Sequence, residues 1–301
     1  MYMPPTTARR CSLLLAALYA SLGFSSNVLA DSPLRWKFAV GEKLSCNVAQ
    51  DFSLTMNTSP TEQKNSTIQQ IMDMTLDVQG VDQNGEAVIV VKFDRIQSKV
   101  SYPVPIEFDT AKDGPADGKA ATFAPLFKAM TQGEFEVTMT ARGEIKDVKV
   151  PQEVTDVLKT NQAAMGDLAT PKGLQEAIMH WAFVLPEKAP ERGERSIGSA
   201  AVKTPLGISV ETSYTYDGVK EVDGKKFARF LPSVTMNVQG SSTMQTKVKD
   251  QKSDGEVLFD IEQGRLASMD RKYQAALEIT EVGRAMQEQV SQNIQVKLAP
   301  K

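Results

Sequence analysis

The stretch WKFAVGEKLSCNVAQDFSLTM, residues 36–56, decides how the chain folds, because its large apolar side chains fall on even positions. A period of two places such side chains on one face of an extended backbone. The sequence therefore predicts one long bent strand or a strand pair, with Gly41 as the kink or bulge. Cys46 lies on the apolar face, where we expect a small buried hydrophobe, resistant to bulky thiol reagents, rather than a reactive thiol. The even-numbered apolar residues are Trp36, Phe38, Val40, Leu44, Cys46, Val48, Phe52, Leu54 and Met56.

The same alternation continues along the chain and is interrupted by turn signals. A second apolar face runs through 68–78, and the Asn84-Gly85 dipeptide then predicts a tight hairpin turn. The return strand at 86–93 is apolar on both faces, which indicates a central, covered strand. A further hairpin turn is predicted at Asp223-Gly224.

Three short helices are expected, near residues 122–132, 151–165 and 171–184. Gly133 follows the first helix at a position where glycine commonly ends one. Pro171 lies in the first turn of the third, where proline is well tolerated. These helices are too few and too short to form a bundle, so they are expected to pack on the sheet.

A proline- and charge-rich linker at 186–196 separates an N-terminal half, 31–185, from a C-terminal half, 197–301, in which the strands resume. The glycine turns at Gly143 and Gly264 make the second half a candidate quasi-repeat of the first in the same domain, although their spacing from the preceding hairpin turns differs. The sequence thus predicts an α+β fold, mainly antiparallel β. We expect a large curved sheet or open barrel with about three short helices packed on it. Whether this is one domain or two stays open.

The first thirty residues have the pattern of a secretory signal peptide. A basic start at Arg9-Arg10 precedes an apolar run at 11–24, and small residues at Val28 and Ala30 precede a cleavage position. The expected protein is exported through the secretory route and works in the periplasm or outside the cell.

Composition excludes several classes of partner and site. The net charge of −3 over 301 residues argues against nucleic acid as a partner. No stretch after the signal is apolar enough to span a bilayer. Cys46 is the only cysteine beyond residue 30, so an internal disulfide, a CxxC redox site and a cysteine-based metal site are all excluded.

Catalytic motifs are not found around the single histidine, His180. No H-E-x-x-H, G-x-S-x-G or phosphate-binding glycine loop occurs, so we expect no metal site, no cofactor and no catalytic residues. The IGSAA segment at 197–201 has the composition of an ordinary loop. On a helical wheel Trp181 faces the core and His180 lies beside that face, which favours a structural role for both.

Thirteen methionines are the one compositional oddity. Several lie on predicted apolar strand faces, where flexible thioethers suit either an adaptable core or a groove for variable apolar ligands. The candidate groove residues are Met56, Met72, Met74, Met139 and Met236.

A family resemblance is carried by five segments in a fixed order. The chain resembles a family of exported bacterial β-rich proteins classed as a domain of unknown function, although its linker lacks the tryptophan usual in that group. The resemblance implies no reaction and no catalytic residues. The architecture is also loosely similar to the lipoprotein-carrier (half-barrel) fold of the bacterial envelope. The five segments are LRWKFAVGEKLSCNVAQ, the Asn84-Gly85 hairpin, GEFEVTMTARGEIKDV, LQEAIMHWAFVLPEKAPERGER and DGEVLFDIEQGRLASM.

Three functions follow from these observations. The favoured one is a non-catalytic exported protein that binds a lipid or another hydrophobic ligand in a groove of the curved sheet. The alternative is a structural or interaction module of the cell envelope with an envelope protein as partner. A carboxylate-based hydrolase is the third.

Overall fold

The structure is a computed structural model that describes residues 32–59, 62–101, 105–112, 120–160, 170, 172, 178, 183–203, 208–238, 244–281 and 284–301. The predicted signal segment lies outside the described residues. So do His180 and Trp181, with most of the predicted helix at 171–184.

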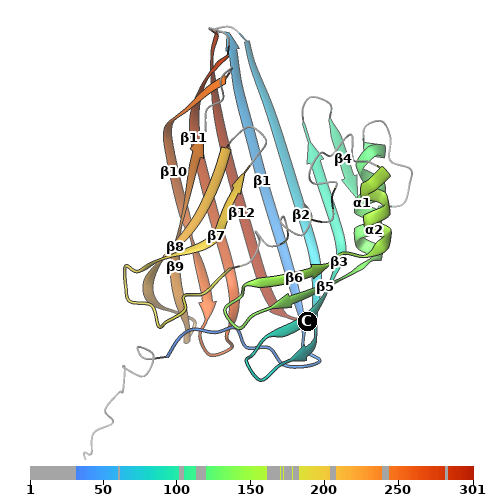
Figure 1. The fold of residues 1–301 in the computed structure, drawn as a ribbon, viewed down its shortest axis with the longest axis vertical. Coiled ribbons are helices and arrows are strands. Elements are labelled where there is room, and N and C mark those ends of the chain that lie inside the picture. Colours follow the sequence, from blue (N-terminus) through green and yellow to red (C-terminus); the bar gives the residue numbers. More distant parts are fainter. Residues whose placement is uncertain are drawn as a thin grey trace, which may run out of the picture.

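One antiparallel sheet of twelve strands forms the molecule (Figure 1). The strand order is β6-β5-β3-β2-β1-β12-β11-β10-β9-β8-β7, and β4 pairs with β3. The bounds are β1 Lys43–Ser59, β2 Glu62–Val81, β3 Ala87–Val100, β4 Ile106–Asp109, β5 Glu134–Met139, β6 Ile145–Lys149, β7 Arg195–Lys203, β8 Ile208–Val222, β9 Lys225–Val238, β10 Met244–Asp260, β11 Arg265–Glu281 and β12 Arg284–Pro300. The predicted mainly antiparallel β fold is confirmed.

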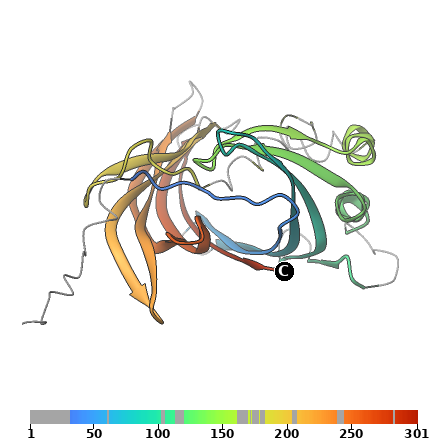
Figure 2. The same cartoon turned by 90° about the horizontal axis from the view of Figure 1, so that it is seen from below.

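The two ends of the chain meet in the middle of the sheet. β1 pairs with β12 from Leu44–Pro300 to Asn57–Gln287, so the first and last strands are neighbours. Among the described residues, β6 and β7 end the strand order, and β4 pairs with β3 alone. Seen from below, the sheet is strongly curved and open, and the N-terminal segment crosses its open side (Figure 2). One continuous sheet therefore runs through both predicted halves, while the quasi-repeat stays a prediction.

Alternation along the strands sorts the side chains into two faces. Leu44, Cys46 and Val48 on β1 are buried on the concave face, as their even positions predict. The residues between them are more exposed and lie on the convex face. The buried residues of the concave face belong to the main apolar core.

Two helices are described, α1 Ala120–Gln132 and α2 Gln152–Thr160. α1 packs on β3 and α2 packs on α1. Leu126 of α1 and Leu158 of α2 are buried and belong to the main core. The first two predicted helices are confirmed, except that residues 161–165 of the second lie outside the described part of the chain.

Residues 32–42 form no strand, which corrects the prediction of a strand beginning at Trp36. We call this segment the strap. Its backbone bonds two turns far along the chain: Trp36 N–H donates to Ala141 O at 2.7 Å, and Lys37 N–H donates to Gly264 O at 2.8 Å. Gly41, with φ +82°, turns the chain into β1 rather than bending a strand. Val40 was predicted to lie on the apolar face, but it is 67% exposed.

The two predicted hairpin turns are confirmed, and they have different geometries. Asp223 and Gly224 both have positive φ, 51° and 75°, which gives a two-residue turn of the mirror-image type between β8 and β9. In the loop between β2 and β3 only Gly85 has positive φ. There Asp82 Oδ1 accepts hydrogen bonds from the backbone N–H groups of Asn84 and Glu86. These N–H donors lower the pKa of Asp82, so this acid is a turn cap rather than a free ligand.

The linker is shorter than predicted, and the segment after it is not a loop. β7 begins at Arg195, so the linker ends at Glu194. The backbone of IGSAA, residues 197–201, is part of β7 and pairs with β8. This segment forms a strand because its backbone pairs with β8, and the amino-acid composition of the segment does not reveal that pairing.

Candidate functional site

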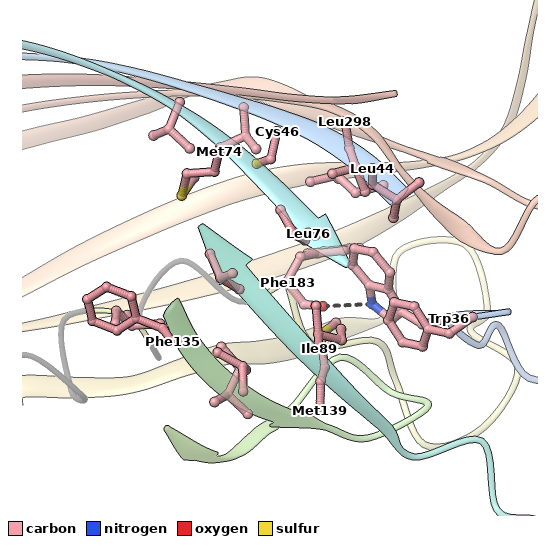
Figure 3. Close-up of a pocket in the computed structure, with 18 of the residues that line it drawn as sticks. Trp36, Leu44, Cys46, Met74, Leu76, Ile89, Phe135, Met139, Phe183 and Leu298 are labelled. Atoms are coloured by element: carbon pink, nitrogen blue, oxygen red, sulfur yellow. Dashed lines mark hydrogen bonds between the residues drawn. The ribbon is translucent and has the colours of Figure 1, made fainter. Parts of the chain in front are cut away.

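An apolar cavity of about 140 Å³ lies in the hollow of the sheet (Figure 3). None of its lining residues carries a charged side chain. They are Trp36, Phe38, Leu44, Cys46, Val48, Met74, Leu76, Ile89, Val91, Phe93, Phe135, Val137, Met139, Ile145, Ile178, Phe183, Leu266, Val296 and Leu298.

Strand alternation builds the wall of this cavity. Neighbouring strands present matched apolar positions, as in the register pairs Cys46–Met74 and Cys46–Leu298. β3 and β5 continue the wall through Ile89 and Val137, which are also register partners. A cavity lined by paired strands is rigid at these positions, because each residue is held by ladders on both sides.

The strap covers one side of the cavity through Trp36 and Phe38. The ring of Trp36 stacks on Phe38 at 5.8 Å and meets Phe259 edge-on at 5.6 Å. Its indole N–H donates to the carbonyl oxygen of Phe183 at 3.3 Å. This bond ties the strap to the segment just before the linker, and it satisfies the one polar atom of a side chain that is only 8% exposed.

Two glycine turns make room for the strap. A Cβ at Gly143 would lie 2.3 Å from the carbonyl oxygen of Phe183 and 2.4 Å from Nε1 of Trp36. A Cβ at Gly264 would lie 2.4 Å from Cγ of Lys37. Both glycines also have positive φ, 91° and 63°. The similar turns noticed in the two halves of the sequence thus contact one segment.

Charged side chains hold the strap from outside the cavity. Arg35 donates to the carbonyl oxygens of Pro186 and Glu187 at 3.1 and 2.6 Å. The ammonium group of Lys37 donates to Glu262 O at 3.1 Å. These bonds join the strap to the linker and to the turn between β10 and β11, so three distant segments meet at the closure.

Cys46 is a neutral thiol in the cavity wall. It is 9% exposed, and burial raises its pKa to about 12. The expected buried position is confirmed, and the thiol is a suitable chemical reporter of access to the cavity.

The methionines chosen from the sequence are only partly brought together. Met74 and Met139 line the cavity. Met72 is buried in the main core but does not line the cavity, and Met236 belongs to a second apolar cluster. Met56 is partly exposed towards the far end of β1. A role of these residues in ligand binding stays a prediction.

Sequence reasoning missed the aromatic residues that close the cavity. Trp36 and Phe38 were assigned to a strand, and Phe183 was assigned to an apolar side of the predicted helix rather than to a site. The signal available was the density of aromatic residues at 36–38 next to a non-strand glycine, Gly41.

The buried acids of the described chain serve as structural caps. Asp109, 7% exposed, accepts from Arg95 at 3.0 and 2.7 Å and also from Ala111 N–H. The Arg95 guanidinium holds the pKa of that carboxyl well below its ordinary value. Asp260 Oδ1 caps the next turn by accepting from Gln263 N–H at 2.8 Å. Within the described residues no group of three or more His, Cys, Asp or Glu converges to hold a metal ion. No helix in that part of the chain has the length and apolarity needed to cross a membrane.

Comparisons with known proteins give weak structural matches only. No protein-family model and no curated protein matches the sequence. The chain is similar to a LolA superfamily protein from Nitrosomonas europaea, with 6% identity and TM-score 0.16 over 88% of each chain. It is also similar to a DUF1329 family protein from Desulfovibrio piger, with 8% identity and TM-score 0.15 over 85% of each chain. A third match is DynF of the dynemicin biosynthesis pathway of Micromonospora chersina, with 8% identity and TM-score 0.17 over 94% of this chain and 93% of that one. The weak structural matches thus include both groups that the sequence resembles, a family of unknown function and the lipoprotein-carrier fold.

Proposed function

We propose that this chain is an exported, non-catalytic protein of the cell envelope that binds an apolar ligand, or the apolar part of a lipid-like one, in the cavity under the strap. The observation that carries the proposal is the cavity itself, with its uncharged lining and its closure by a separate segment. The signal-like first thirty residues support the export route.

The energetics favour a binding role over a packing defect. The apolar side chains around this space lack the packing neighbours of a filled core, and the missing contacts cost free energy. Native cores contain few voids of this kind. An apolar ligand that fills the space restores the lost contacts, so the cost becomes part of the binding free energy.

The size of the cavity limits the apolar group that fits without rearrangement. An engineered cavity of about 150 Å³ with a similar apolar lining stays dry and binds benzene. The cavity therefore accepts a single ring or a short chain end.

The proposal is tested with Cys46 as the reporter. Purified protein is titrated with 4-phenylbutan-1-ol while the modification of Cys46 by methyl methanethiosulfonate is followed by mass spectrometry. We expect the alcohol to slow the modification in a saturable way, because its ring occupies the space beside the thiol. A modification rate independent of the alcohol at every concentration contradicts the proposal.

Two isoleucines of β3 provide matched variants. Ile89 lines the cavity and Ile96 does not, although both are buried, at 2% and 0% exposure. We expect Ile89→Phe to fill the space and weaken binding at least about tenfold, and Ile96→Phe to leave the affinity unchanged in whatever fraction folds. Native mass spectrometry of protein from its own host adds a second measurement. A bound apolar mass supports the proposal, whereas an empty protein with a reproducible partner supports the interaction module instead.

A further inference from the structure

Three polar side chains lie on the concave face one step beyond the cavity, in a register row that also contains the buried Ile294. Gln70 of β2 pairs with Gln50 of β1, Gln50 with Ile294 of β12, and Ile294 with Arg271 of β11. We call Gln50, Gln70 and Arg271 the polar belt. It interrupts a face that is otherwise apolar on these strands from Leu44 to Val48 and from Leu266 to Met269.

The belt faces the same side as the cavity. Gln50 lies two residues beyond the cavity-lining Val48 on β1. Arg271 lies two residues beyond Met269, the register partner of the cavity-lining Val296. A step of two residues keeps a side chain on one face and advances it by roughly 6.6–6.8 Å. The belt is therefore one short linker away from an apolar group in the cavity.

Arg271 reaches across the hollow to β8. Its Nη1 donates to Oγ1 of Thr212 at 3.2 Å. Its positive charge also lies near the phenol of Tyr214 and partly offsets the rise that burial causes in the pKa of that group. Tyr214 packs edge-on against Phe183, which lines the cavity, with ring centroids 4.9 Å apart. The belt and the cavity thus share a border at Phe183 and Tyr214.

No carboxylate of the described residues pairs with Arg271. Its strand neighbours Asp270 and Lys272 alternate to the convex face, where they pair with each other at 3.6 Å. Its register partner on β10 is Gly255, which adds no side chain beside it. The hydroxyl of Thr212 accepts a hydrogen bond but carries no charge, so this partly buried guanidinium has no counter-ion among the described residues.

An unneutralised guanidinium in such a setting favours an anion. Removing a cation from water is costly unless a charge partner compensates for the loss. A guanidinium has five N–H donors and matches a planar carboxylate with two parallel hydrogen bonds. The amides of Gln50 and Gln70 are neutral donors on the same face, two and three strands away from Arg271 in the sheet order.

We propose that the polar belt is the head-group subsite for a carboxylate whose apolar tail occupies the cavity. This inference rests on the proposed function and names the ligand class: a monocarboxylic amphiphile. One arginine supplies one positive charge, which suits a mono-anionic head group.

A pair of probes that differ only in the head group tests the proposal. 4-Phenylbutyrate and 4-phenylbutan-1-ol share a ring of the size the cavity accepts and a short alkyl linker, and their affinities are measured by calorimetry for the same variants. We expect Arg271→Gln to lower the affinity for 4-phenylbutyrate by about tenfold to a hundredfold. The affinity for 4-phenylbutan-1-ol should fall by less than about twofold. Arg271→Lys should restore part of the difference, since it keeps the charge and loses the planar fork.

Lys272→Gln is the matched control. It removes the same charge one residue away, from a side chain that is 53% exposed on the opposite face. Because salt screens an exposed charge, both affinities should stay within about twofold of the parent values at physiological salt. If the role of Arg271 were purely structural, its substitution would change the affinities for both probes equally.

The outcomes separate this proposal from the one on which it rests. Equal losses for both probes in Arg271→Gln, or an equal effect of Lys272→Gln, overturn the head-group subsite and leave apolar binding standing. Failure of the parent protein to bind either probe overturns both proposals. If Arg271→Gln does not fold, Gln50→Leu replaces it, and a selective loss of 4-phenylbutyrate affinity is again the expected result.

Discussion

Below the polar belt the concave face meets a segment from outside the sheet, whereas above the belt it meets the sheet's own strands. The lower part is covered by the strap, through Trp36 and Phe38. In the upper part Val234 and Met236 of β9 pack against Tyr273 of β11, together with Ala275 and Leu277. The two parts therefore use the same alternating strands but different covers.

The register of β9 and β10 explains why β9 can pack over the concave face of the sheet. Their ladder covers only Val257–Asp260 and Phe227–Phe230. Beyond it, side chains of β10 take over as hydrogen-bond partners of β9: Ser253 Oγ accepts from Val234 N–H at 2.8 Å, and Gln251 Oε1 accepts from Met236 N–H at 2.9 Å. Beyond its backbone pairing with β10, β9 packs over the concave face of the same sheet.

The difference between β9 and the strap explains why the cavity lies in the lower part of the concave face. Two strands that pack face to face interdigitate their side chains along their whole length. A strap fixed at a few backbone bonds presents two aromatic rings and leaves the remaining volume as a cavity. Curvature alone does not make the site, because the second cluster lies in the same curved sheet.

The largest effect is expected for loss of the strap's indole. Trp36→Ala should lower the free energy of unfolding by about 3–5 kcal/mol, since it removes a buried aromatic ring and leaves the carbonyl of Phe183 without this donor. Chemical denaturation measures the change, and the modification of Cys46 should accelerate in the same variant. Val40→Ala, also in the strap but at a residue 67% exposed, should change stability by less than about 0.5 kcal/mol. A loss below about 1 kcal/mol for Trp36→Ala would show that the strap is not a tight cover.

A pair of glycines tests the closure more finely. Gly143→Ala places a Cβ against the backbone oxygen of Phe183, and its φ is +91°, so we expect a loss of about 2–4 kcal/mol. Gly193 has nearly the same φ, +90°, but nothing within 4 Å of its added Cβ. Gly193→Ala should therefore cost only the backbone strain, about 1–2 kcal/mol. Equal losses in thermal or chemical unfolding would mean that the strap yields at Gly143 without resistance.

The strap shows what the sequence could and could not predict. The alternation at Trp36 and Phe38 correctly predicted which side chains face the core. It could not distinguish a strand from an extended cover, because both present every second residue to one side. The backbone partners that decide the matter, Ala141 and Gly264, lie about a hundred and more than two hundred residues away.

The cavity shows a similar division. Met74 and Met139 were identified because they lie on apolar faces, but Met72 and Met236 met the same criterion and do not line it. Membership depends on where the strap crosses the sheet, which is a tertiary property. Arg271 was readable in principle, because it falls in phase with Met269 and Tyr273 in an apolar series.

The smallest effect is expected in the upper part, as a loss of stability at high pH. Burial raises the pKa of Tyr273 to about 12, above the value near 10 of an exposed tyrosine. The folded state therefore favours the neutral phenol. Its contribution to stability is complete below pH 10 and is lost as the pH rises towards 12, with about 1 kcal/mol lost by pH 11. Denaturation midpoints at pH 8, 10 and 11 measure this loss.

Tyr273→Phe isolates that contribution from the other titrating groups. The variant keeps the ring in the upper cluster and removes only a hydroxyl whose bond to Gln251 Oε1 is long, at 3.3 Å. Its stability at pH 8 should therefore stay close to that of the parent, while its loss between pH 8 and pH 11 should be smaller by about 1 kcal/mol. Identical pH profiles for the two proteins would mean that solvent reaches Tyr273. In that case β9 would not be a tight cover, and the contrast between the two parts of the concave face would fail.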